Sequence, residues 1–199
     1  MQPINQLFAL ACPLPLENVD TDQLIPARFM KESRAAGYGA FLLHDMRFDR
    51  DGSPREFILN HPDAEHAQIL VARRNFGAGS SREAAVYALV DFGFRCVIAP
   101  SFGDIFASNA VNNGLLPALV SEQDCELLLG ALANNVGQIQ VDLTAQKITL
   151  GDISVGFDIN PTWKLKLLNG WDDIDLTNAE AATIERFRES YRNHYPWLG

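Results

Sequence analysis

Residues 75–83 read Asn75-Phe76-Gly77-Ala78-Gly79-Ser80-Ser81-Arg82-Glu83, and this stretch decides the fold. An apolar run at residues 69–72 precedes it and predicts a buried strand. Apolar residues at helical spacing follow it and predict a helix over residues 81–92. A glycine-rich turn from a strand into a helix brings backbone N–H groups close to an anion. The turn therefore predicts recognition of a small carboxylate or phosphate by its glycines, its serines and the Arg82 guanidinium.

A purely structural role for Ser80 is the main alternative at this turn. Ser80 and Glu83 match the S-x-x-E capping box, in which the serine only accepts hydrogen bonds from the first N–H groups of the helix. Capping leaves the second serine, the two glycines and Arg82 unexplained. The turn is not a P-loop, because no lysine follows its second glycine, and it lacks the closing glycine of a G-x-S-x-G elbow.

The composition is that of a globular protein with one core. The chain has 199 residues, of which 47% are hydrophobic, and no apolar run is long enough to span a bilayer. A secretory signal is not visible at the N-terminus. The net charge of −9 argues against nucleic acid as a partner. Most lysines and arginines lie in residues 1–95, the half that contains the turn, which fits an anionic substrate.

The three cysteines, Cys12, Cys96 and Cys125, are odd in number and far apart. This pattern argues against a disulfide framework and predicts a protein of the reducing cytoplasm. No C-x-x-C is present, so we expect neither an iron–sulfur cluster nor any other metal site in this chain. The four histidines show no H-x-x-x-H ligand pattern either.

The patterns predict one α/β domain over residues 1–199, with a mixed sheet flanked by helices and ending in a C-terminal helix. Strands are expected at residues 7–11, 23–25, 69–72, 96–99 and 115–120, the last near a sheet edge because of Pro117. A β-α-β unit is expected at residues 69–99, and an antiparallel meander at residues 139–143, 147–150 and 153–157. Further helices are expected from Ser101 to Asn113, at residues 122–134 and at residues 177–194.

Side-chain patterns also predict which helix faces are apolar. The helix at residues 122–134 is expected to face inward with Leu127, Leu128, Ala131 and Leu132. The apolar face of the last helix is expected to comprise Ala181, Ile184, Phe187 and Tyr191. Residues 31–56 are expected to form a long mobile loop with at most one short helix. Residues 161–199 are expected to form a C-terminal extension of the domain.

Three stretches together resemble the small subunits of 3-isopropylmalate dehydratase, which correspond to the swivelling domain of the aconitase superfamily. They are residues 19–31, which contain Asp20-Thr21-Asp22; residues 75–83; and residues 97–106 continuing through 112–117, which contain Pro100-Ser101-Phe102-Gly103-Asp104. Their order and spacing match the family, and the resemblance extends over nearly the whole chain. It implies a swivelling-type β/β/α domain.

The resemblance implies a hydro-lyase subunit that interconverts 2- and 3-isopropylmalate in leucine biosynthesis through an unsaturated intermediate. In this family a [4Fe–4S] cluster binds the hydroxy-dicarboxylate substrate as a Lewis acid, and its cysteines lie in a separate large subunit. Ser80 is implied as the base that takes a proton from carbon. Ser81, Arg82, Gly79 and Gly77 are implied to bind the substrate. On this interpretation the partner of the helix end is Glu83 rather than Ser80.

The loop after Pro26 is implied to contact the variable side chain of the substrate, through Phe29, Met30, Lys31 and Arg34. Two departures from the family pattern concern the substrate. Ala35-Ala36 stand where many relatives have Arg-Thr, and Ala84 stands where relatives often have His. A paralogous hydro-lyase for a citramalate-, dimethylmalate- or homocitrate-type substrate therefore stays open, as does a non-catalytic carboxylate-binding module. Neither a membrane nor a nucleic acid is expected as a partner.

Overall fold

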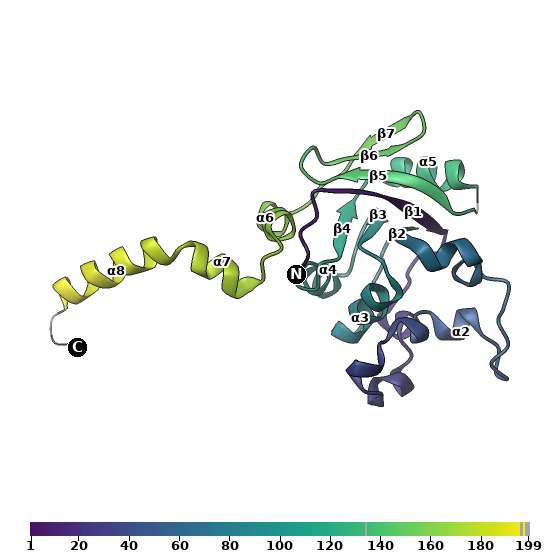
Figure 1. The fold of residues 1–199 in the computed structure, drawn as a ribbon, viewed down its shortest axis with the longest axis horizontal. Helices are drawn as coiled ribbons and strands as arrows, with labels where there is room; N and C mark the ends of the chain where they lie inside the picture. Colours follow the sequence, from purple (N-terminus) through teal and green to yellow (C-terminus); the bar gives the residue numbers. More distant parts are fainter. Residues whose placement is uncertain (134, 196, 198–199) are drawn as a thin grey trace.

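A seven-stranded mixed sheet forms the centre of the computed structural model, which describes residues 1–133, 135–195 and 197 (Figure 1). The strand order is β4-β3-β2-β1-β5-β6-β7. Strands β1 to β4 pair in parallel, whereas β1, β5, β6 and β7 pair antiparallel. The long strand β1 therefore joins a parallel half to an antiparallel meander. The strands are β1 (Gln6–Leu14), β2 (Ala67–Ala72), β3 (Cys96–Ala99), β4 (Leu116–Leu119), β5 (Gly137–Asp142), β6 (Lys147–Leu150) and β7 (Ile153–Gly156).

Helices cover both faces of the parallel half. The α-helices of the described residues are α1 (Thr21–Leu24), α2 (His44–Arg47), α3 (Glu83–Phe92), α4 (Asp104–Asn112), α5 (Glu122–Leu132), α6 (Pro161–Asn169), α7 (Asp173–Ala179) and α8 (Ala181–His194), of which α7 and α8 do not pack on the sheet. Leu89 of α3 and Leu70 of β2 belong to one buried core. Leu128 of α5 and Ile69 of β2 belong to a second core. Because neighbouring residues of β2 point into opposite cores, this strand reads as a continuous apolar run.

The elements predicted most directly from apolar runs are confirmed. β2, α3 and β3 form the expected β-α-β unit with parallel strands. β3 covers residues 96–99 as predicted, and β4 lies at one edge of the sheet. The three strands of the meander are also present and antiparallel.

Two local predictions are wrong. Residues 23–25 were expected to form a strand, but α1 occupies this position. Asp20 Oδ1 accepts a hydrogen bond from Gln23 N at 2.7 Å, and Asp20 N donates to Gln23 Oε1 at 2.9 Å, which is a complete capping box. In α5, Leu127 is 48% exposed and Ala131 is exposed, so the predicted inward face is displaced around the helix. The buried residues of α5 are Cys125, Leu128, Leu129 and Leu132.

The segment between β1 and β2 is also more structured than expected at residues 31–56. Besides α2, it contains short 3-10 helices at Ala27–Lys31, Arg34–Ala36, Gly39–Phe41, Ile58–Asn60 and Pro62–His66. The prediction of at most one short helix is therefore wrong. The mobility expected for these residues stays a prediction.

Contacts with α3 position this segment. The Arg34 guanidinium makes a two-bond ion pair with the Asp91 carboxylate of α3. It also lies 4.3 Å from the ring centre of Tyr87, one turn earlier on the same helix. The backbone N–H of Tyr38 donates to Asp91 Oδ2 at 2.7 Å. Gly39 lies so close to α3 that a Cβ atom there would be 2.7 Å from the carbonyl group of Asp91. The segment is therefore held against the second half of α3.

The C-terminal helices have a different environment. The predicted helix at residues 177–194 is divided into α7 and α8, which extend away from the rest of the molecule (Figure 1). Neither helix contains a buried residue. In contrast, α6 packs on the body of the molecule through Lys166 and Leu167. The amphipathic pattern of α8 is thus present, but its apolar face does not contribute to the core.

We expect the Gly39→Ala substitution to destabilise the protein. The added methyl group would collide with the backbone of α3 at 2.7 Å, and the segment would have to move away from Asp91. Overpacking of this kind lowers the free energy of unfolding by about 1–3 kcal/mol. Urea unfolding followed by circular dichroism measures the change.

Gly130→Ala is the matched control, because Gly130 is exposed on α5 and a Cβ atom there meets nothing within 4 Å. This substitution should raise the free energy of unfolding by about 0.5–1 kcal/mol, since alanine is the better helix former. If Gly39→Ala is as stable as the unchanged protein, the close approach to α3 is not a constraint.

Candidate functional site

The three stretches that resemble the family meet at one edge of the sheet. β1, β2 and β3 run parallel, so the residues that follow them all leave the sheet at the carboxyl ends of the strands. Ligand sites in parallel sheets commonly lie at this edge. Isolated bridges pair Asp20 with Ala78 and Phe76 with Phe102, so the stretch after β2 lies between the other two.

Backbone hydrogen bonds fix the turn at residues 75–83 to the stretch after β1. Gly77 N donates to Val19 O at 2.7 Å, and Thr21 N donates to Ala78 O at 2.9 Å. The hydroxyl of Thr21, a buried residue, donates to Ser80 O at 3.0 Å. The backbone of Ser80 is therefore held by α1, although the serine itself is exposed.

The opposite side of the turn is bound to the stretch after β3. Phe76 N donates to Ser101 O at 3.0 Å, and Gly103 N donates to Phe76 O at 2.9 Å. Asn75 N donates to Ser101 Oγ at 2.8 Å. The turn is thus held on both sides before the helix α3 begins.

Glycine is required at Gly77 and Gly103 because the stretches approach each other so closely. Gly77 has φ +71°, and a Cβ atom there would lie 2.2 Å from the ring of Phe106. A Cβ atom on Gly103 would lie 2.6 Å from Gly77 O. The predicted close approach of a glycine backbone is present, but the group approached is another part of the same chain.

A small pocket of about 200 Å³ opens beside this turn. It is lined by Gly77, Gly79, Ser80, Gly103, Asp104, Ile105 and Phe106. The structure therefore brings together three of the predicted site residues, Gly77, Gly79 and Ser80. Gly103 and Asp104 were missed as site residues by the sequence analysis. Their position directly after a parallel strand was the signal that could have identified them.

Ser81 and Arg82 do not line this pocket. Ser81 is exposed, whereas the Arg82 side chain is only 19% exposed. The Arg82 guanidinium forms an ion pair with the carboxylate of Asp22 on α1. Asp22 was quoted for the family resemblance but not predicted as a site residue, and the structure makes it the present partner of the predicted carboxylate fork.

The capping alternative for Ser80 is wrong. α3 begins at Glu83 with Arg82 at the N-cap position, and no side chain of the described residues caps its first N–H groups. The expectation that Glu83 serves the helix end is also wrong, because Glu83 Oε1 accepts a hydrogen bond from Asn113 Nδ2 of the neighbouring segment at 3.0 Å. The uncapped N-terminus of α3 therefore presents its partial positive charge next to Ser80 and Ser81.

The predicted specificity residues lie away from the Ser80 pocket. Phe29 stacks on Phe41 with ring centres 4.3 Å apart, Met30 is 44% exposed, and Lys31 is exposed. Arg34 is bound to Asp91, which lies roughly 12 Å along α3 from the first residue of that helix. None of the four lines the pocket. Their role in substrate choice stays a prediction.

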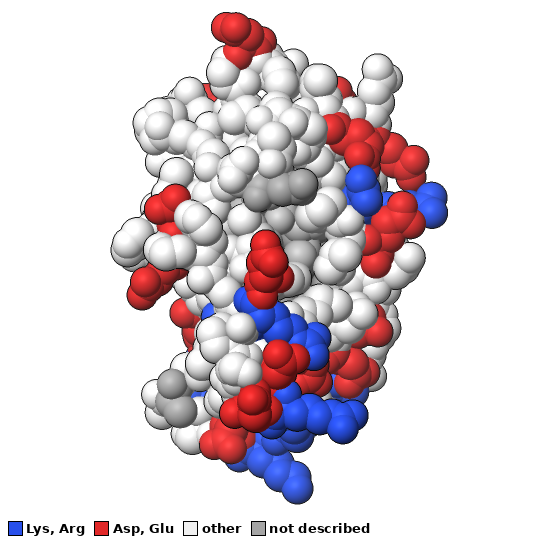
Figure 2. Space-filling view, turned by 90° about the vertical axis from the view of Figure 1, so that its right-hand side faces the viewer, with Lys and Arg blue, Asp and Glu red and all other residues white. Residues whose placement is uncertain are grey.

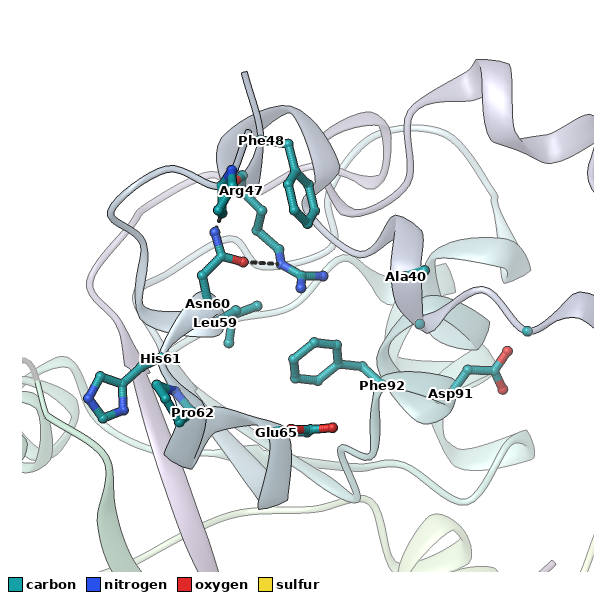
Figure 3. A pocket seen from close by; sticks show the side chains of 13 residues that line it. Ala40, Arg47, Phe48, Leu59, Asn60, His61, Pro62, Glu65, Asp91 and Phe92 are labelled. Carbon is teal, nitrogen blue, oxygen red and sulfur yellow. Dashed lines mark hydrogen bonds between the residues drawn. The ribbon is translucent and has the colours of Figure 1, made fainter. Parts of the chain in front are cut away.

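A larger pocket of about 590 Å³ lies between the segment that joins β1 to β2 and the C-terminal end of α3 (Figure 3). Arg47 Nε donates to Asn60 Oδ1 at 3.0 Å, and the Arg47 guanidinium lies about 5 Å from the ring centres of Phe48 and Phe92. Burial lowers the pKa of Arg47. No residue of the turn at 75–83 lines this pocket. Arg47 thus contacts the surrounding segment, at a place separate from Ser80.

Basic side chains gather at one end of the molecule, interleaved with acidic ones (Figure 2). In the segment around α2, Arg28 pairs with Asp45, and Arg55 Nε lies 2.8 Å from Asp49 Oδ1. The concentration of arginine in the first half of the sequence is therefore offset by paired carboxylates here. Arg82 is the cation within the turn at residues 75–83, the predicted anion site.

The cysteine side chains do not form a metal site. Cys12 lies on β1, Cys96 on β3 and Cys125 on α5, and all three are buried. Burial raises the pKa of Cys12 and of Cys125 to about 12, and also raises that of Cys96. Within the described residues, no group of three or more His, Cys, Asp or Glu side chains could hold a metal ion. No helix in the described part of the chain has the length and apolar character needed to cross a membrane.

Comparisons with known proteins agree with this geometry. Residues 1–123 match the model of the family described as the aconitase C-terminal domain. A protein of Rhodospirillum centenum (strain ATCC 51521 / SW), named 3-isopropylmalate dehydratase small subunit, is 44% identical over 200 residues, which are 99% of this chain and 98% of that protein. A protein of the same name from Caulobacter vibrioides (strain NA1000 / CB15N) is also 44% identical, over 100% of this chain and 99% of that protein.

A solved structure supports the fold. The crystal structure of 3-isopropylmalate dehydratase from Methanocaldococcus jannaschii superimposes with a TM-score of 0.67 and covers 91% of this chain and 99% of that chain. The two sequences are 22% identical, so this likeness concerns the fold alone. From the family match over residues 1–123 and the full-length identity of 44%, the chain belongs to the aconitase C-terminal domain family and, within it, to the 3-isopropylmalate dehydratase small subunits.

Proposed function

We propose that this chain is the small subunit of a hydro-lyase that interconverts 2- and 3-isopropylmalate in leucine biosynthesis and acts only with a large subunit. The full-length identity to two small subunits of that name supports the reaction and the partner. The observation that carries the mechanism is the placement of Ser80. Its backbone is fixed by Thr21, and it lines a pocket beside the uncapped N-terminus of α3.

Ser80 Oγ is the proposed base. As an alkoxide it takes the proton from the substrate carbon, and the electrons of that C–H bond form the carbon–carbon double bond. The hydroxyl group leaves the neighbouring carbon with the C–O electron pair and takes a proton from solvent to depart as water, while Ser80 keeps the proton taken from carbon until it returns it in the reverse addition. Addition of water in the opposite sense completes the isomerisation. A serine alkoxide requires positive potential, which the N-terminus of α3 and the Arg82 guanidinium supply.

Arg82 and Ser81 are the proposed ligands of a substrate carboxylate. The Arg82 guanidinium already holds a carboxylate, that of Asp22, whose side chain is 58% exposed. A substrate carboxylate that enters from solvent can replace or join this partner in the same planar fork. Gly77 and Gly79 line the pocket together with Ser80, and we propose that they let the substrate approach the backbone there.

We propose that the [4Fe–4S] cluster of the family is held by the large subunit. The residues of this chain do not fit a cluster, because its three thiols are buried on separate elements with raised pKa values. Reduced, unpaired cysteines support a cytoplasmic location. The acidic net charge of −9 supports a small-molecule substrate rather than nucleic acid.

Ser80→Ala should abolish most turnover without affecting assembly. Removal of a general base lowers kcat by about 10²- to 10⁴-fold. Turnover is measured on 3-isopropylmalate with the anaerobically reconstituted two-subunit enzyme, and assembly by size-exclusion chromatography. Ser154→Ala, on the exposed face of β7, is the control and should retain full kcat. Retention of normal kcat by Ser80→Ala would show that another group is the base.

Arg82→Lys should lower kcat/KM by about 10- to 100-fold, because lysine cannot donate two parallel hydrogen bonds to one carboxylate. Steady-state kinetics of the reconstituted enzyme measure the loss. Arg55→Lys is the matched control, since Arg55 pairs with exposed Asp49 away from the turn. An unchanged kcat/KM in Arg82→Lys would argue against a carboxylate ligand at this position.

A further inference from the structure

Helices α7 and α8, here called the arm, form an apolar surface that no residue in the described part of the chain covers. Neither helix has a buried residue, and Phe187 is 68% exposed. Figure 1 shows the arm leaving the body after α6 with no other element beside it. A 14-residue helix such as α8 is marginal in water without tertiary packing. An amphipathic helix of this kind is stabilised by a partner that covers its apolar face.

The apolar face of α8 is a narrow stripe. Ile184, Phe187 and Tyr191 are separated by three and four residues, so they lie on one side of the helix. The rings of Phe187 and Tyr191 stack with centres 5.8 Å apart, and Tyr191 lies 5.0 Å from Tyr195. We call these four residues the stripe. Large aromatic groups with this arrangement are typical anchors in helix-in-groove recognition.

The root of the arm is fixed to the body. Lys166 of α6 is only 3% exposed, and its Nζ donates to Asp173 Oδ1 of α7 at 2.6 Å and to the Asn112 side chain of α4. The backbone N–H of Trp171 donates to Lys166 O at 2.9 Å, and the amino group of Met1 donates to the neighbouring Gly170 O at 2.9 Å. These contacts, centred on the buried Lys166 amino group, hold the start of α7 against the body.

The surface between the Ser80 pocket and the arm is continuous. Asp104 lines the Ser80 pocket and also a neighbouring groove of about 330 Å³. Phe102, Pro117 and Trp163 of α6 line the groove as well. α4 spans the distance, because its first turn lines the pocket and Asn112 at its other end contacts Lys166, roughly 12 Å away along the helix. A partner that covers the Ser80 pocket therefore meets the groove, then α6, and then the arm.

We infer that the arm is a docking helix for the large subunit, whose surface receives the stripe in an apolar groove. This inference rests on the proposed function for the existence of that partner. The stripe is flanked on one side by Arg188, which pairs with Glu185 of the same helix at 3.1 Å, and by Arg192, while Thr183 and Ser190 lie on the other side. The receiving groove is therefore expected to carry acidic groups along one rim only. On this inference the arm contributes to the affinity for the large subunit, and the Ser80 pocket contributes the residues that act on the substrate.

The test is the double substitution Ile184→Asp/Phe187→Asp, compared with Ala182→Asp/Asn193→Asp, which places the same two charges on the opposite face of α8. The equilibrium dissociation constant for the purified large subunit is measured by calorimetry under anaerobic conditions. The stripe variant should weaken binding by at least about 100-fold, whereas the opposite-face variant should bind like the unchanged chain. Because the arm has no buried residue, both variants should keep the unfolding midpoint of the body.

A second measurement separates this inference from the proposed reaction. With the stripe variant, kcat should return to within about twofold of normal when the large subunit is raised to saturation, since the pocket is intact. Ser80→Ala should show the reverse, with normal affinity and lost turnover. If neither the unchanged chain nor its variants show dehydratase activity with the large subunit, the proposed function is wrong. The dissociation constants for the large subunit still test the role of the arm in that case.

Two outcomes would overturn the inference. One is equal affinity of the stripe variant and the unchanged chain for the large subunit. The other is a dimer of the isolated chain, seen by analytical ultracentrifugation, that the stripe variant dissociates while its affinity for the large subunit stays normal. That result would assign the arm to a second copy of this chain. Arg188→Glu/Arg192→Glu tests the acidic rim, and it should weaken binding more at low salt than at high salt.

Discussion

The approach of Gly77 to the ring of Phe106 and to the backbone of Val19 constrains the whole candidate site. A glycine with φ +71° lets the turn after β2 enter the space between the stretches after β1 and β3. Its N–H then reaches Val19 O at 2.7 Å, and the following residues are held by Thr21. Because three chain segments share this contact, the position of Ser80 is determined by the parallel half of the sheet rather than by the turn alone.

The ion pair between Arg82 and Asp22 explains how a binding cation can be kept ready without a ligand. A guanidinium that is only 19% exposed would be costly to leave without a counter-ion. Asp22 supplies that counter-ion, yet its own side chain is 58% exposed and remains accessible to water. Exchange of one carboxylate for another in the same fork costs little, because the guanidinium is already oriented and already partly desolvated.

The sequence predicted the features that depend on local apolar patterns, and it missed those that depend on distant partners. The β-α-β unit follows from apolar runs that cannot avoid burial. Residues 23–25 were predicted as a strand because a run of three residues fits a strand and a helix equally well. The capping box of Asp20 and Gln23 favours the helix. The Arg34–Asp91 pair joins residues 57 positions apart, which no periodicity reveals. Ser80 could be predicted as a candidate site residue, and it lines a pocket. That it does not cap α3 depends on the tertiary contact of its backbone with Thr21, which the sequence does not show.

The character of the site also explains why association would need a separate surface. Ser80, Ser81 and the glycine at position 79 are exposed, small and polar, so they offer little apolar area to a partner. A larger apolar surface at that point would compete with a dicarboxylate for the same space. A helix outside the core avoids this conflict. Its aromatic side chains can bind the partner without affecting the packing around Gly77. The contacts of Lys166 with α4 and α7 connect the two surfaces, so that a partner bound at the arm lies near the pocket.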